Sequence, residues 1–132
     1  MPRATPPAVD RSPLPARVAV WLLDSQRLGQ ASSVKRIAGR LLKHPARAGV
    51  VLAQSRLGQL LCADGDSPRD RRVGAQLLRE AAKAGDCRAQ LVLGRLLLEG
   101  EHAQPEQARH WLRLAAVGGQ AEARLLLRRL PA

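Results

Sequence analysis

A motif of paired alanines followed by a glycine turn recurs at regular intervals and constrains the fold of this chain more than any other feature. Residues 81–85 read Ala-Ala-Lys-Ala-Gly, and residues 115–119, thirty-four positions later, read Ala-Ala-Val-Gly-Gly. Thirty-six positions before Gly85, Gly49 keeps the spacing to Ala53 and Leu57. A period of this length is typical of stacked helical hairpins, because one hairpin alone cannot bury its apolar face. The repeat predicts an all-α fold, a short α-solenoid of antiparallel helix pairs.

The composition agrees with a helical fold. Apolar residues make up 45% of the 132 residues, yet Phe and Tyr are absent, so Leu, Ala and Val must fill the core. Leu and Ala are strong helix formers, and strand-forming aromatic residues are scarce. The length suits one domain with a modest core.

The domain organisation follows the repeat. Residues 1–15 contain five prolines, which predicts a disordered tail, with a proline-rich ligand for a partner domain as the alternative. The helical repeat domain is expected over residues 16–132, with a degenerate repeat at 16–48, repeats at 49–85 and 86–119, and a polar capping helix at 120–130. This amounts to about three hairpins and a C-terminal capping helix.

The degenerate repeat is predicted to hold two helices. The first is expected over residues 16–28, with Trp21 as a core anchor, and Ser32 or Ser33 is expected to cap the second. Pro45 is expected to stop or kink that helix near His44. Its buried side is predicted to consist of Val34, Ile37, Leu41 and Leu42.

Helix starts are clearer in the later repeats. Ser67 before Pro68 predicts an N-cap, and Asp86 is expected to cap the following helix. Gly58 and Gly94 fall inside predicted helices, where glycine costs roughly 0.5–1 kcal/mol, so close helix packing is their expected role.

These motifs resemble the Sel-1-like repeat, a relative of the tetratricopeptide repeat, and suggest a small bacterial member. One full unit is matched by Ala89, Leu93, Gly94, Leu97, Gly100, Ala108, Trp111, Ala115, Ala116 and Gly119. The unit before is matched by Ala53, Leu57, Gly58, Leu61, Asp70, Ala81, Ala82 and Gly85. The chain departs from the family at Leu61 and Leu97, where tyrosine is usual, and in a short loop after Gly100. The resemblance implies an α-solenoid that scaffolds protein complexes, often in bacterial signalling, envelope or secretion systems.

No catalytic constellation is visible, so we expect a protein that is not an enzyme and has no catalytic residues, cofactor or metal. His44, His102 and His110 have no Cys, Asp or Glu at ligand spacing. No phosphate-binding glycine loop and no nucleophile with a histidine base can be recognised.

Cys62 and Cys87 are expected to be reduced structural thiols. In the predicted repeat they lie at opposite ends of parallel neighbouring helices, roughly 15 to 20 Å apart, beyond disulfide reach. Together with the lack of a secretory signal or an apolar run long enough to span a membrane, this predicts a cytoplasmic protein without membrane insertion.

The formal net charge of +11 raises the question of partners. Gln59, Arg95 and Arg129 occupy equivalent positions in three successive first helices, which are expected to line the concave face. The predicted partner-binding residues are therefore Arg56, Gln59, Arg95, Arg124, Arg128 and Arg129. Solubility and a GC-rich genome would explain the same charge without any site.

Three kinds of association follow from this surface. The first expectation is a non-catalytic adaptor or regulator that binds an acidic segment of another protein through Arg–carboxylate pairs. The alternative is a nucleic-acid-binding repeat protein, since the first 49 residues hold nine Lys and Arg against two Asp. Against this alternative, both tryptophans are expected in the core and none is left for base stacking. A degenerate first repeat would also leave apolar surface for a homodimer at the N-terminal end.

Overall fold

A computed structural model describes residues 13–25, 31–65 and 67–131. Within this part of the chain all regular structure is helical, in the following order: α1 (Leu14–Asp24), α2 (Ser32–Arg47), α3 (Val51–Asp64), α4 (Pro68–Lys83), α5 (Cys87–Leu98), α6 (Pro105–Val117) and α7 (Ala121–Arg129). The prediction of an all-α repeat fold is confirmed. Residues 1–12 of the predicted tail lie outside the described residues.

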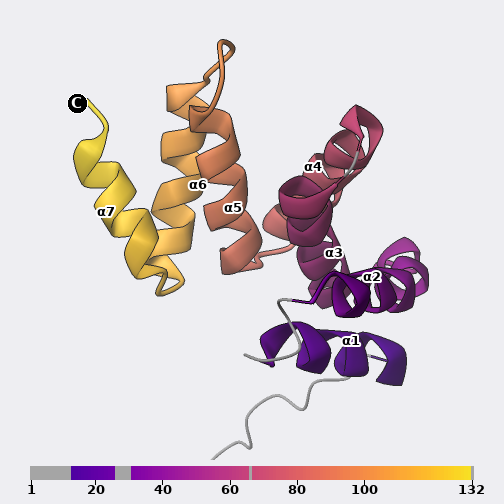
Figure 1. The fold of residues 1–132 in the computed structure, drawn as a ribbon. Helices are drawn as coiled ribbons and strands as arrows, with labels where there is room; N and C mark the ends of the chain where they lie inside the picture. The colour runs from indigo at the N-terminus through magenta and orange to yellow at the C-terminus, as the bar shows by residue number, and fades with distance from the viewer. Residues whose placement is uncertain (1–12, 26–30, 66, 132) are drawn as a thin grey trace, which may run out of the picture.

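The helices stack as successive hairpins, with α1 at one end of the array and α7 at the other (Figure 1). Each helix packs on the next one along the chain, and the pairs α3–α4 and α5–α6 have the most extensive contacts. The first helices of successive hairpins also touch, since α3 contacts both α1 and α5. We call this side of the array the first-helix face.

Three glycine turns join the successive units by one repeated hydrogen-bond pattern. Gly49, Gly85 and Gly119 have φ values of 88°, 99° and 96°, a left-handed conformation that glycine adopts without a steric penalty. After α4, Gly85 N–H donates to Ala82 O at 3.1 Å, and the next N–H donates to Ala81 O at 3.0 Å. These are the two bonds of a Schellman motif, and the paired alanines supply its acceptors.

Pro45 does not stop α2, which continues to Arg47, so a helix end near His44 is wrong, while a kink there stays a prediction. The proline side chain is buried with Ala46 in the core. Its carbonyl accepts from Val50 N–H at 3.0 Å, which is the Schellman bond that Ala81 accepts one repeat later. Pro45 therefore substitutes for the first alanine of the motif, because that position needs a carbonyl and not an N–H.

The predicted caps are confirmed in the later repeats and wrong in the first. The Ser67 hydroxyl accepts from Asp70 N–H at 3.1 Å, and the Asp86 carboxylate accepts from Ala89 N–H at 2.8 Å. In α2 the N-cap residue is Ala31, and no side chain caps the helix.

Glycines permit the closest helix contacts. A Cβ added to Gly94 would lie 2.7 Å from Leu112 Cγ, and one added to Gly58 would lie 2.8 Å from Leu78 Cγ. Real Cβ atoms do not tolerate such distances, so the predicted packing role of Gly58 and Gly94 is confirmed. Gly74, which faces Gly58 on α4, serves the same purpose.

The N-terminal hairpin differs from the prediction. α1 begins at Leu14 and ends at Asp24, and Ser25 is already extended, so the helix does not run to residue 28. Trp21 is 65% exposed and is not a core anchor, and Ile37 is 52% exposed. Ala16 and Ala19 face the core instead, because their small side chains let α1 lie close to α2.

Candidate functional site

The first-helix face brings two of the predicted binding residues together. Gln59 of α3 and Arg95 of α5 line one cavity of about 350 Å³ between these helices. The remaining lining residues are Cys62, Ala63, Val92, Leu96 and Glu99. The equivalence of positions 59 and 95 in the repeat therefore corresponds to proximity in space.

Arg95 already has an acidic partner. Its guanidinium lies 3.1 Å from the Glu122 carboxylate at the start of α7, and both side chains are nearly half exposed. Arg124, Arg128 and Arg129 are exposed further along α7. The structure therefore leaves three arginines of α7 exposed, while Arg95 is paired with Glu122.

Arg56 is placed differently from the other predicted binding residues. Only 8% of it is exposed, and its guanidinium pairs with the carboxylate of Asp24 on α1. Among the described residues, its Nε has no hydrogen-bond partner. Arg56 links α3 to α1 and offers little surface to a partner.

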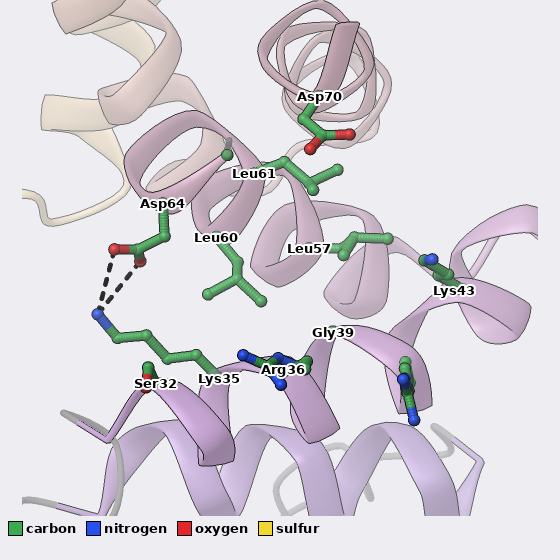
Figure 2. Close-up of a pocket in the computed structure, with 12 residues that line it drawn as sticks. Ser32, Lys35, Arg36, Gly39, Lys43, Leu57, Leu60, Leu61, Asp64 and Asp70 are labelled. Atoms are coloured by element: carbon green, nitrogen blue, oxygen red, sulfur yellow. Dashed lines mark hydrogen bonds and ion pairs between the residues drawn. The ribbon is translucent and has the colours of Figure 1, made fainter. Parts of the chain in front are cut away.

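A larger cavity, of about 480 Å³, lies between α2 and α3 and was not anticipated from the sequence. Its residues are Ser32, Lys35, Arg36, Gly39, Arg40, Lys43, Leu57, Leu60, Leu61, Asp64, Gly65 and Asp70, and we call it the α2–α3 groove. Figure 2 shows three leucines of α3 between the basic side of α2 and Asp70 of α4. The groove therefore combines an apolar floor with a cationic wall.

The spacing of the basic residues on α2 is the sequence signal for this groove. Lys35, Gly39 and Lys43 follow one another at intervals of four, which places them on one face of a helix. Arg36 and Arg40 form the adjacent row. Helix periodicity alone does not show which helix lies across from these rows, so the sequence predicts no groove here.

Charge in the α2–α3 groove is only partly neutralised. Lys35 Nζ lies 3.2 Å from an Asp64 carboxylate oxygen, an ion pair drawn in Figure 2. Within the described part of the chain, Arg36, Arg40 and Lys43 form no ion pair. Arginine binds a carboxylate through two parallel hydrogen bonds, so this wall is suited to acidic side chains.

Cys62 lies where two cavities meet, between α3 and α5 and between α4 and α5. Burial raises the pKa of the Cys62 thiol above its ordinary value of 9.0, and the Glu99 carboxylate raises it further. The thiol is therefore protonated at neutral pH and a poor nucleophile. Both cysteines are free.

Other chemistry has little support in the described residues. They contain no group of three His, Cys, Asp or Glu side chains placed to hold a metal ion. None of the helices that the structure describes is both long and apolar enough to cross a membrane. Trp111 is half-buried and packs edge-on against His110, with ring centroids 5.1 Å apart.

The comparisons with known proteins agree on one family. The family model described as Sel1 repeat matches residues 51–86 and 87–119. A crystal structure of a Sel1 repeat protein from Oxalobacter formigenes is similar, with a TM-score of 0.66 and 26% sequence identity, over 88% of this chain and 86% of that chain. No curated protein matches the chain significantly.

Sel1 repeats are in general protein–protein interaction modules, and proteins built from them are typically non-catalytic scaffolds. The two matched units cover more than half of the chain, and the similar structure extends the likeness over most of it. The chain belongs to the Sel1 repeat family.

Proposed function

We propose that this chain is a non-catalytic cytoplasmic adaptor or regulator that binds an acidic segment of a partner protein. The observation that carries the proposal is the α2–α3 groove, in which a cationic wall stands beside a leucine floor. Acidic side chains on such a segment would pair with the arginines, and its apolar side chains would cover the leucines.

The first-helix face is the second candidate surface for the same segment. Arg95 is exposed there, and Gln59 lies beside it in the cavity between α3 and α5. Arg124, Arg128 and Arg129 are exposed on α7, the next first helix. The Glu122 carboxylate competes for Arg95, so a segment bound here would have to displace an existing ion pair. For this reason we place the segment first in the α2–α3 groove.

Two charge-matched variants separate these surfaces. One combines Arg36→Glu with Arg40→Glu in the α2–α3 groove, and the other combines Arg95→Glu with Arg129→Glu on the first-helix face. Both remove two positive charges and add two negative ones, so their effect on bulk electrostatics is equal. The probe is a synthetic amphipathic peptide of glutamates and leucines, with binding followed by fluorescence anisotropy.

The first variant is expected to lose about tenfold or more in affinity for the glutamate peptide, because two charge-assisted contacts are reversed. The second is expected to bind nearly as the unmodified chain does. The opposite pattern would move the site to the first-helix face. If the unmodified chain binds the glutamate peptide no better than a lysine counterpart at physiological salt, the proposed function is wrong.

Nucleic-acid binding stays as an alternative, and one observation favours it. Trp21 is 65% exposed on α1, so the expectation that both tryptophans are buried does not hold, and one aromatic ring is available for stacking. Single-stranded RNA in a salt series tests this alternative. Specific binding at physiological salt that is lost in Trp21→Ala would support it, whereas binding only at low salt would reflect bulk charge.

Homodimerisation through the N-terminal end also stays a prediction. Leu14, Val18 and Trp21 are exposed at intervals of four and three residues on α1. Sedimentation of the unmodified chain and of Val18→Glu over a concentration series tests it. A monomer at all concentrations would contradict this prediction.

A further inference from the structure

The α2–α3 groove has an equivalent one repeat later. A cavity of about 240 Å³ between α4 and α5 is lined by Cys62, Arg71, Ala75, Arg79, Leu93, Leu96 and Leu97, and we call it the α4–α5 groove. Six of these residues lie thirty-six positions after residues of the first groove, which are Lys35, Gly39, Lys43, Leu57, Leu60 and Leu61. The repeat therefore reproduces the residues that line a groove and not only the backbone fold.

The six matched positions also share their chemistry. Each second helix contributes a small residue between two cations, Gly39 in α2 and Ala75 in α4. The facing first helix contributes three leucines in both grooves. A small residue at the centre leaves space between the helices, and the flanking cations border it.

The next junction has an arginine where the two grooves have a small residue. Thirty-four positions after Ala75 comes Arg109 of α6, and its guanidinium donates to the Pro131 carbonyl beyond α7. The arginine side chain thus crosses the junction that a small residue leaves open in the two preceding ones. The two successive grooves therefore share a small central residue that the α6–α7 junction does not have.

The two grooves adjoin each other across α3 and α4. Leu61 lines the first groove and Cys62 the second, and likewise Asp70 lines the first and Arg71 the second. Consecutive residues of the same helices therefore face both grooves. A segment that occupies both grooves would have to cross this end of the α3–α4 hairpin.

We propose that both grooves are occupied together by one partner segment that carries two clusters of acidic and apolar residues. The proposal rests on the proposed function and adds to it the number and spacing of the binding positions. When one cluster is bound, the second binds intramolecularly, at an effective concentration set by the intervening chain. The two-cluster segment therefore binds more tightly than either cluster alone.

Three synthetic peptides test this proposal with the full chain. The first has one glutamate–leucine cluster. The second has two clusters joined by a glycine–serine linker, prepared in several lengths. The third is identical to the second, but the glutamates of its second cluster are replaced by glutamine.

Three double variants accompany the peptides: Arg36→Glu with Arg40→Glu in the first groove, Arg71→Glu with Arg79→Glu in the second, and Arg88→Glu with Arg113→Glu as a charge-matched control outside both. All six substituted arginines are exposed. The four of the groove variants line their grooves, and the two of the control do not. Circular dichroism checks that each variant folds.

The two-cluster peptide is expected to bind the unmodified chain at least about tenfold more tightly than either other peptide, at a linker length that spans both grooves. This gain is expected to disappear in both groove variants and to persist in the control. If the gain is absent at every linker length, or survives Arg71→Glu with Arg79→Glu, the two-groove proposal is wrong. Failure of the one-cluster peptide to bind the unmodified chain would instead contradict the proposed function.

Discussion

Arg56 of α3 is buried against Asp24 of α1, and this ion pair joins the N-terminal hairpin to the first well-preserved repeat. The Arg56 side chain is 9% exposed, whereas the Asp24 side chain is 58% exposed. The two partners therefore differ in what their removal leaves behind. Loss of Asp24 leaves a buried cation without its counter-charge, while loss of Arg56 leaves a carboxylate that water can solvate.

Asp24→Ala is expected to lower the free energy of unfolding by about 1 to 2 kcal/mol. This value is below that of a fully buried pair, because Asp24 is largely exposed to solvent. Urea unfolding followed by circular dichroism measures the change. Arg56→Met in the Asp24→Ala background is expected to recover part of the loss, since methionine fills the space without a charge. No recovery in the double variant would contradict this account.

Gly94→Ala is expected to lower the free energy of unfolding by about 1 to 2 kcal/mol, although alanine is the better helix former. Its Cβ would lie 2.7 Å from Leu112 Cγ and Cδ2, so either Leu112 or the α5–α6 contact must shift. Gly39→Ala is the matched control, because its Cβ would meet only the end of the Leu60 side chain, at 3.3 Å. This control is expected to be neutral or stabilising, and equal losses in both variants would contradict the packing role of Gly94.

Gly85→Ala is expected to cost about 1 kcal/mol, for a reason unrelated to packing. Nothing lies within 4 Å of a Cβ at this position, and the φ of 99° is unfavourable for any residue with a side chain. Gly85→Asn is expected to cost less than alanine, since asparagine adopts left-handed backbone more readily. Thermal unfolding of the two variants would show this order, and equal midpoints for alanine and glycine would refute it.

Alkylation of Cys62 by iodoacetamide is expected to rise with pH and to reach its half-maximal rate above pH 9.0. The Cys87→Ser variant isolates this thiol, and the pH of the half-maximal rate separates ionisation from simple shielding. Since the raised pKa reflects burial first and the Glu99 carboxylate second, Glu99→Gln is expected to shift the profile to lower pH. A profile centred at or below that of the unfolded chain would contradict the assignment.

The same shift has a consequence for stability, because the folded chain favours the neutral thiol. The pKa of the Cys62 thiol is higher in the folded than in the unfolded chain. The contribution of this thiol to the free energy of unfolding is therefore fully present below pH 9.0. That contribution is lost as the pH rises through the folded value. The stability difference between the unmodified chain and Cys62→Ser is therefore expected to narrow in alkaline solution.

Much of the fold could be predicted from local features of the sequence. Backbone conformation and close steric fit select particular residue types at single positions. Examples are the glycine turns, the caps at Ser67 and Asp86, and the small residues Gly58 and Gly94. These residue types recur with a period of thirty-four to thirty-six residues, so each repeat supports the assignment of the next.

The errors arose where a residue's role depends on a neighbouring helix. Trp21 is exposed because the alanines of α1 face α2. The error at Pro45 is local instead, because the N–H of Val50, five residues on, needs only the Pro45 carbonyl. Arg56 occupies a position on a first helix like the other predicted binding residues, but α1 brings Asp24 to it.

The sequence by itself determined the helices, their turns and the repeat, because these follow from interactions between residues close together in the chain. Only the tertiary structure decided which charges remain available to a partner, since that depends on pairs such as Lys35 with Asp64 and Arg95 with Glu122, which lie on different helices. It also showed that Lys35 and Arg71, thirty-six positions apart, border equivalent grooves. Charge is a property of residues, but a binding surface depends on which helices pack side by side.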